Sequence, residues 1–185
     1  MRIVGGAFRS RRLTAPRGPT RPTADRARES LFGALGDVEG ATCLDLFAGS
    51  GALAFEALSR GAAHATLVEV DRAALAAIEA NAEALGVADR VRVVRRDARR
   101  VLRDEAREGR RYDLLLIDPP YDALYDVIPV LDRHLAAVAA PGARVVVEAA
   151  AGSPVELADF TLISRRRVGA AELSIYNPVI VGADD

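Results

Sequence analysis

The sequence contains no lysine, no tryptophan, one cysteine and only two histidines in 185 residues. Cys43 cannot form an intrachain disulfide, and its apolar neighbours indicate a buried thiol. Because His64 and His134 lie far apart in the chain, no cluster has the spacing of a metal site, and we expect no bound metal. No apolar run reaches the roughly 18 residues of a membrane span, and no apolar signal core follows the N-terminal arginines. These absences favour a cytoplasmic protein without a membrane partner.

The basic residues are all arginines, and they are distributed unevenly. Residues 1–28 hold eight arginines and one acidic residue, a net charge of +7, whereas the rest of the chain holds 17 arginines and 25 acidic residues, a net charge of −8. A basic segment on an acidic body indicates a polyanionic partner such as a nucleic acid, and the alternative is a flexible, solubilising tail. The candidate nucleic-acid contacts are Arg9, Arg11, Arg12, Arg21 and Arg26.

Half of the residues are apolar, which fits one domain with a proper core. Proline and glycine make residues 2–20 a short β-hairpin and loop, and a helix with one apolar face follows from Pro22. We therefore divide the chain into a basic N-terminal hairpin or arm, residues 1–22, and a main domain, residues 23–185.

From residue 41 onward, strand and helix patterns alternate, which predicts a doubly wound α/β sheet. Strands are expected at 42–46, 65–70, 91–95, 112–117 and 143–148, and helices at 52–59, 72–85, 98–108 and 122–139. An antiparallel pair is expected at 160–167 and 171–176. In the helix at 98–108 arginines alternate with Asp104, Glu105 and Glu108, a pattern typical of a solvated face.

A glycine-rich turn, Asp45-Leu46-Phe47-Ala48-Gly49-Ser50-Gly51-Ala52-Leu53, lies where a buried strand passes into a helix. Glycines there let backbone N–H groups approach a ligand, and Glu69 at the end of the next strand is placed to accept hydrogen bonds from a ribose. These features fit any adenosine-type cofactor, and Gly49-x-Gly51-x-x-Ala54 also matches the dinucleotide fingerprint of dehydrogenases. Asp45 would sit awkwardly beside a pyrophosphate, but it suits the ammonium and sulfonium groups of S-adenosylmethionine.

Asp97 follows the third strand of the pattern. It is placed either to accept a hydrogen bond from the adenine amino group of such a cofactor or to cap the next helix, and it can do both.

The segment Asp118-Pro119-Pro120-Tyr121 follows the apolar strand 112–117. Ligands of parallel α/β sheets bind at the carboxyl ends of the strands, so this segment and the glycine turn are expected on one rim. The Asp118 carboxylate and a proline carbonyl can accept both N–H groups of an exocyclic amine, leaving its nitrogen facing an electrophilic methyl group. Tyr121 offers a flat face to a base turned out of its stack. Glu148 ends a strand on the same rim, and the sequence assigns it no role.

Several blocks of residues together are similar to one family. They are Arg2-Ile3-Val4-Gly5-Gly6 with Arg9-x-Arg11-Arg12-Leu13, Arg21-Pro22-Thr23-x-Asp25-Arg26-x-Arg28-Glu29-Ser30-Leu31-Phe32, Leu44–Leu53, Glu56–Gly61, Glu69-x-Asp71-Arg72 and Asp118–Tyr121. On these blocks the chain resembles the bacterial RsmD family, methyltransferases that act on the N2 of a guanine in 16S ribosomal RNA. The last block alone is shared with adenine-N6 and cytosine-N4 DNA methyltransferases, so the two N-terminal blocks single out the family.

The resemblance implies a Rossmann-like S-adenosylmethionine-dependent methyltransferase sheet of seven strands, the last antiparallel, with a small N-terminal β-hairpin extension. It implies a substrate in an assembling small ribosomal subunit, with ribosomal proteins as part of it, and we expect a monomer. The catalytic residues are expected to be Asp118, Pro119, Pro120 and Tyr121. The cofactor-binding residues are expected to be Asp45, Phe47, Ala48, Gly49, Gly51, Glu69, Asp97 and Ala98. Two alternatives remain: a DNA adenine-N6 or cytosine-N4 methyltransferase, and a non-catalytic RNA-binding assembly factor.

Overall fold

The computed structural model describes residues 1–15, 22–120 and 123–179, and for residues 22–24 the backbone alone. Its helices are α1 (Pro22–Leu35), α2 (Ala52–Ser59), α3 (Arg72–Leu85), α4 (Ala98–Arg107) and α5 (Leu124–Val138), with a 3-10 turn at Ala88–Arg90. Its strands are β1 (Thr42–Asp45), β2 (His64–Glu69), β3 (Val91–Arg95), β4 (Tyr112–Ile117), β5 (Ala139–Ala150), β6 (Phe160–Val168) and β7 (Ala171–Pro178). None of these helices is long and apolar enough to cross a membrane.

The seven strands form one mixed sheet in the order β3-β2-β1-β4-β5-β7-β6. Strands β1 to β5 are parallel, whereas β7 runs antiparallel to both β5 and β6. This arrangement confirms the predicted sheet with its final strand antiparallel. Strand β5 is longer than the predicted strand 143–148. It begins at Ala139, which pairs with Tyr112 before a register shift.

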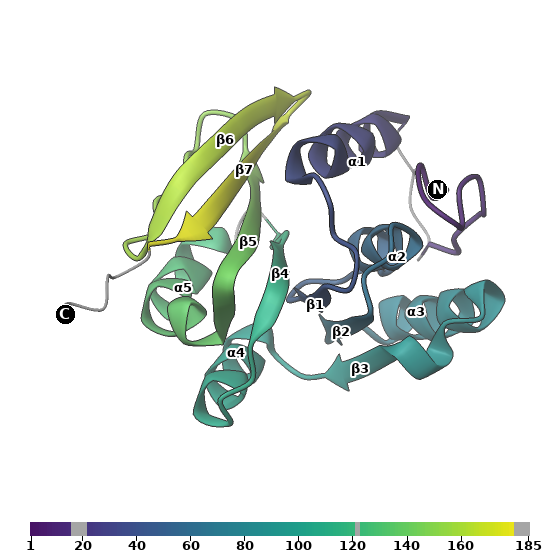
Figure 1. The fold of residues 1–185 in the computed structure, drawn as a ribbon, viewed down its shortest axis with the longest axis horizontal. Helices are drawn as coiled ribbons and strands as arrows, with labels where there is room; N and C mark the ends of the chain where they lie inside the picture. The colour runs from purple at the N-terminus through teal and green to yellow at the C-terminus, as the bar shows by residue number, and fades with distance from the viewer. Residues whose placement is uncertain (16–21, 121–122, 180–185) are drawn as a thin grey trace.

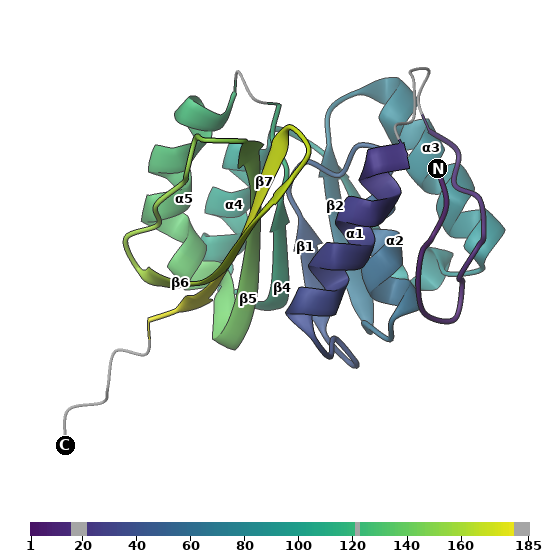
Figure 2. The same cartoon turned by 90° about the horizontal axis from the view of Figure 1, so that it is seen from above.

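Side chains of the central strands alternate between two core layers, as the period of a strand requires. Leu116 and Val146 pack with residues of α1, α2 and α3 on one face of the sheet. Leu115 and Val147 pack with residues of α4 and α5 on the other face. Figures 1 and 2 show the two groups of helices on opposite sides of the sheet. The same alternation determines to which face of the sheet a side chain at the end of a strand points.

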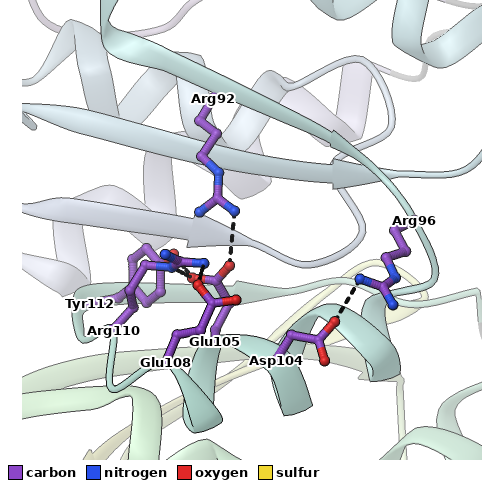
Figure 3. Close-up of polar contacts among 7 residues, drawn as sticks. All are labelled: Arg92, Arg96, Asp104, Glu105, Glu108, Arg110 and Tyr112. Carbon is purple, nitrogen blue, oxygen red and sulfur yellow. Dashed lines mark hydrogen bonds and ion pairs between the residues drawn. The ribbon is translucent and has the colours of Figure 1, made fainter.

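One acidic residue of helix α4 is buried, although the sequence pattern predicted that it is exposed to solvent. Glu105 was expected on a solvated face but is 1% exposed. Its carboxylate accepts hydrogen bonds from Arg92 at 3.1 Å, Arg110 at 2.5 Å and the Tyr112 hydroxyl at 2.6 Å (Figure 3). Burial alone would raise the pKa of Glu105, but these donors lower it below its usual value. The prediction was wrong because the helix turns this position toward β3 and β4, where three donors compensate the buried charge.

The N-terminal loop, residues 1–15, has antiparallel ends joined by one bridge between Arg2 and Arg12. The Ile3 N–H donates to the Arg11 carbonyl at 3.0 Å, and the Leu13 N–H donates to the Met1 carbonyl at 3.0 Å. The expected hairpin is thus present in its shortest form. Ile3 and Leu13 are buried in the core layer that also contains α1 and α2.

The N-terminal loop is fixed to the end of α2. Gly6 has a φ of +72°, and a Cβ there would lie 1.9 Å from the Ser59 carbonyl oxygen, so only glycine allows this approach. The Ser59 hydroxyl donates to the Gly5 carbonyl at 2.6 Å and accepts from the Phe8 N–H at 2.9 Å. Buried Glu56 accepts the Val4 N–H at 2.8 Å. Residues 1–15 are therefore a docked segment, and the alternative of a flexible tail is wrong for them.

Candidate active site

The glycine turn between β1 and α2 contains two glycines in different surroundings, Gly49 beside open space and Gly51 packed against other side chains. Gly49 has a φ of +55°, and a Cβ there would meet no atom of the described residues within 4 Å. Gly51 has a φ of +80°, and a Cβ there would lie 2.5 Å from a ring carbon of Phe55. Gly51 is therefore required for packing, whereas the backbone at Gly49 is accessible to a ligand.

Glu69, at the end of β2, holds this turn in place. One carboxylate oxygen accepts the Gly49 N–H at 2.8 Å, and the other accepts the N–H groups of Val70 at 2.7 Å and Asp71 at 2.9 Å. The structure thus brings Glu69 and the glycine turn together, as the sequence predicted. Val70, beside it, is an apolar side chain that is 58% exposed.

A cavity of about 420 Å³ opens at the carboxyl ends of β1, β4 and β5. That volume lies within the roughly 300–1,000 Å³ common for small-molecule sites. Its walls come from α1, the glycine turn, Met1 and the connection between β6 and β7. Of the predicted cofactor residues it contains Asp45, Phe47, Ala48 and Gly49, and of the predicted catalytic residues Asp118.

Among the described residues, three carboxyl groups face this cavity: Asp45 from β1, Asp118 after β4 and Glu148 from β5. Each stands two residues after a side chain of the α1–α3 core layer, namely Cys43, Leu116 and Val146. Because strand side chains repeat every two residues, all three point to the same face of the sheet. Ile117 pairs with Val147 in the register, so Asp118 and Glu148 are level on neighbouring strands.

Asp45 is a buried carboxylate that has no hydrogen-bond partner in the described part of the chain. It is 1% exposed, and neither of its oxygens has a hydrogen-bond partner among the described residues. Burial raises the pKa of Asp45 to about 7, and the carboxylate of Glu69 adds to the rise. The N–H groups of Phe47 and Ala54 oppose it in part without reaching hydrogen-bond geometry. Such a group favours a ligand that brings positive charge or N–H donors.

The pKa values of both Asp118 and Glu148 are raised. Burial, followed by the charges of Glu148 and Asp45, raises the pKa of Asp118 well above its ordinary value. Burial also raises the pKa of Glu148. Both groups therefore gain from donors that stabilise their ionised forms.

The remaining parts of the predicted catalytic turn are only partly described. Pro119 is buried and Pro120 is exposed. Tyr121 lies outside the described residues.

One arginine faces the acidic cavity. Arg28, on α1, is 6% exposed, and its Nε has no hydrogen-bond partner among the described residues. Its Nη2 donates to the Arg2 carbonyl at 2.9 Å and to Asp25 at 2.5 Å. The buried guanidinium is thus held in place beside the cavity, and no described residue uses its Nε–H.

Asp97 and Ala98 lie at the start of α4 rather than in this cavity. Asp97 caps the helix by accepting the N–H groups of Arg99 at 3.1 Å and Arg100 at 3.3 Å. A hydrogen bond from the Arg99 side chain lowers the pKa of Asp97. The cap that the sequence offered as one alternative is thus present.

Four of the five candidate RNA contacts are described, and all four are exposed: Arg9, Arg11, Arg12 and Arg26. Arg21 lies outside the described residues. Arg11 also donates a hydrogen bond to the Ala84 carbonyl near the end of α3. It therefore helps to hold the N-terminal loop in place, whereas no such bond is found for Arg9 or Arg12 in the described part of the chain.

The N-terminal loop is joined to the glycine turn through one side chain. Asn81 of α3 is 2% exposed, and its Nδ2 donates to the carbonyls of Thr14 at 2.9 Å and Ser50 at 3.0 Å. Its Oδ1 accepts the Thr14 N–H at 2.7 Å. The loop and the turn thus share one buried amide.

Sequence reasoning did not assign site roles to Arg28, Glu148 or Asn81. For Arg28 a signal existed, because it stands on the apolar helix face with Leu31 and Leu35. For Glu148 the signal was a charged residue at the end of the apolar run of β5. For Asn81 the sequence held no such signal, because the residues that it contacts, Thr14 and Ser50, are distant in the sequence.

Comparisons with known proteins agree with this architecture. A profile of the family Conserved hypothetical protein 95 matches residues 1–177. The chain is 38% identical over its whole length to Ribosomal RNA small subunit methyltransferase D of Escherichia coli strain K12, covering 93% of that protein.

Two solved structures extend the similarity to three dimensions. The structure of yhhF from Escherichia coli gives a TM-score of 0.81 at 38% identity, covering 96% of this chain and 97% of that one. A hypothetical protein of Thermus thermophilus, TTHA0928, gives a TM-score of 0.80 at 30% identity, covering 96% and 99%. The chain therefore belongs to the Conserved hypothetical protein 95 family, which is the RsmD family that its motifs resemble.

Proposed function

We propose that this protein transfers a methyl group from S-adenosylmethionine to the N2 of a guanine in 16S ribosomal RNA of the small subunit. The observation that carries the proposal is the cavity, in which Asp45 beside the glycine turn has no hydrogen-bond partner among the described residues and Asp118 stands at the next strand end. Family membership and the printed name of the Escherichia coli relative supply the substrate class.

The charges of the cavity favour S-adenosylmethionine over a dinucleotide. Three carboxyl groups in one cavity would repel a pyrophosphate, whereas a sulfonium and an ammonium would relieve their mutual repulsion. Arg28 is the matching cation for the carboxylate at the amino-acid end of the cofactor, because its Nε is buried and without a partner among the described residues. Glu69 would accept the ribose hydroxyls, and Val70 would offer an apolar contact to the adenine.

The cofactor-binding residues proposed are those expected from the sequence, with Arg28 and Val70 added. Asp97 and Ala98 are kept at the adenine end, where Asp97 would combine a contact to the base with its helix-capping bonds. S-adenosylmethionine supplies an electrophilic methyl group, and the protein supplies the position of the acceptor.

The acceptor amine would be held by Asp118 and the Pro119 carbonyl, each accepting one N–H. In this arrangement the nitrogen would face the methyl group, and transfer would form the N–CH₃ bond as the bond from methyl to sulfur breaks. One N–H proton then leaves the methylated amine, with Asp118 as the nearest acceptor. Tyr121 stays a proposed stacking partner for the base.

Recognition of RNA is proposed to lie with the N-terminal arm, residues 1–22, next to a methyltransferase domain of residues 23–185. Exposed Arg9, Arg12 and Arg26 would contact phosphates. Met1 lines the cavity, so the loop borders the place where the base would enter. The physiological substrate would be an assembling small subunit with ribosomal proteins, which requires a cytoplasmic location, and the protein would act as a monomer.

The test is transfer of a labelled methyl group to small subunits from cells that lack the endogenous enzyme, followed by nucleoside analysis. Labelled N2-methylguanine supports the proposal, whereas N6-methyladenine or N4-methylcytosine would refute the choice of base. Binding to subunits without any transfer would instead identify an assembly factor.

A pair of variants separates the amine contact from cofactor binding. Asp118→Ala is expected to abolish transfer while S-adenosylhomocysteine still binds, because Asp118 would contact the acceptor and not the cofactor. Asp89→Ala, at an exposed residue before β3, is the matched control and should keep wild-type activity. Normal turnover by Asp118→Ala would exclude the role of Asp118.

A further inference from the structure

We propose that Glu148 is the residue that selects guanine, by accepting a hydrogen bond from the guanine N1–H beside the amine held by Asp118. The inference rests on the proposed function and adds a specificity-determining residue to it.

The position of Glu148 places it on the acceptor side of the cavity. Asp45 and the glycine turn belong to β1, and Glu69 belongs to β2, on the side of the sheet assigned to the cofactor. Asp118 directly follows β4 and Glu148 lies in β5, and these are the next two strands in the sheet order. Glu148 thus adjoins the residue that would hold the amine.

The register fixes how closely Asp118 and Glu148 stand together. They are level, because the residues before them, Ile117 and Val147, are paired. Level side chains on one face of neighbouring parallel strands start about 4.8 Å apart. On its other side Glu148 pairs with Leu173 of β7, which also lines the cavity. The second carboxyl group therefore stands between Asp118 and an apolar wall.

Two adjacent carboxylates match the donors of guanine and mismatch those of the other amino bases. Guanine carries its N2 amine next to N1–H, so two donors lie side by side on one edge. Adenine and cytosine carry the amine next to a ring nitrogen with a lone pair, N1 or N3. A carboxylate placed beside the amine gains a charged hydrogen bond from guanine and meets electrostatic repulsion from adenine or cytosine.

The surroundings leave Glu148 available for this contact. No hydrogen bond from a described residue is found to lower its pKa or that of Asp118. No group of three or more His, Cys, Asp or Glu side chains in the described ranges is arranged to hold a metal ion. The oxygens of the pair thus accept no hydrogen bond from the described residues, and the donors of guanine would bind to them.

The experiment compares guanine with 2-aminopurine at the acceptor position of 16S rRNA in reconstituted small subunits. The two bases share the N2 amine, but 2-aminopurine has a lone pair at N1 in place of N1–H. Wild-type protein should prefer guanine by about 100-fold in kcat/KM, as expected for loss of a hydrogen bond to a charged group. Glu148→Gln should reduce the preference to about 10-fold or less, because an amide can donate to the N1 lone pair.

2-Aminopurine also lacks the O6 atom of guanine, but this loss affects the wild-type protein and Glu148→Gln equally. The difference in guanine preference between the two proteins therefore reports the contact at N1. Glu148→Ala should lower kcat/KM on guanine by about 10- to 100-fold. Both Glu148 variants should bind S-adenosylhomocysteine with wild-type affinity. Glu156→Gln, at an exposed position after β5, is the matched control and should behave as wild type in every assay.

Three results would overturn the assignment, and one separates it from the proposed function. An unchanged preference for guanine in Glu148→Gln would exclude the contact at N1. A loss of S-adenosylhomocysteine affinity in either Glu148 variant would place the residue at the cofactor instead. Wild-type activity of Glu148→Ala would show that the carboxylate is dispensable. Failure of the wild-type protein to form N2-methylguanine would overturn the proposed function itself.

Discussion

Replacing Asp45 by asparagine removes a buried carboxylate while nearly preserving its shape. In the folded protein burial raises the pKa of Asp45 from 3.8 to about 7. A shift of about three units corresponds to roughly 4 kcal/mol, since each unit is worth about 1.36 kcal/mol. The ionised carboxylate therefore lowers the free energy of unfolding of the ligand-free protein by this amount.

The cost depends on pH in a defined direction. Because the folded-state pKa lies above the unfolded-state value, the cost is absent below about pH 4 and fully present above about pH 7. At pH 8 Asp45→Asn should therefore stabilise the ligand-free protein by about 2 kcal/mol, after subtraction of about 2 kcal/mol for an unpaired buried amide. At pH 5, where most of the cost of the carboxylate is gone, the variant should bring no gain.

The assay is urea unfolding at pH 5 and pH 8, with and without S-adenosylmethionine. Wild-type protein should gain about 2.7 kcal/mol at a cofactor concentration of 100 times Kd, and Asp45→Asn should gain far less at the same concentration. Destabilisation by Asp45→Asn at both pH values would refute the inference that the charge is uncompensated. Wild-type stabilisation of the variant by the cofactor would refute the role of Asp45 in binding it.

Three further predictions concern other parts of the molecule. Arg28→Met should weaken binding of S-adenosylmethionine by at least 10-fold in calorimetry, because the buried Nε would lose its carboxylate partner; unchanged affinity would place the cofactor carboxylate elsewhere. Combined Arg9→Ala and Arg12→Ala should lower the slope of log affinity for RNA against log salt by about one unit or more, whereas Arg133→Ala on α5 should leave it unchanged. Glu105→Ala should reduce the free energy of unfolding by about 3 kcal/mol in urea, since three donors would lose their acceptor; a loss below about 1 kcal/mol would show that the network adds nothing.

The central sheet was predictable because each strand carries its own local signal. Tyr112–Ile117 is apolar apart from Asp113 and lies in the middle of the sheet, as a strand covered on both faces must. The predicted helix at 72–85 matches α3, which Gly86 ends at a φ of +70° and which Asp71 caps through the Ala74 N–H. These elements depend on neighbours in the sequence, so the sequence suffices to place them.

The parts that escaped prediction depend on contacts between distant residues. Glu105 looked like a surface residue because its partners Arg92, Arg110 and Tyr112 come together only in the folded chain. The partners of Glu148 are likewise set by strand order, since β5 adjoins β4 and β7 only once the sheet is built. Local patterns found the rim of the sheet but could not show that a second carboxyl group stands level with Asp118.

In the folded protein the uneven charge of the chain is found in two different regions, the basic N-terminal loop and the acidic cavity. A net charge of −1 would suggest weak affinity for RNA, yet the first 28 residues carry +7 and the remainder −8. The exposed arginines of the N-terminal loop face solvent, whereas Asp45, Asp118 and Glu148 share one cavity. On the proposed function, phosphates would be attracted to the loop and repelled from the cavity, and the cavity would accept a cationic cofactor and a base offering N–H donors. Because Asn81 ties Thr14 of the loop to Ser50 of the glycine turn, the two oppositely charged regions are held at a fixed spacing. An RNA bound by its backbone would therefore present a base to the cavity, and the acidic cavity itself would exclude the phosphates that follow it.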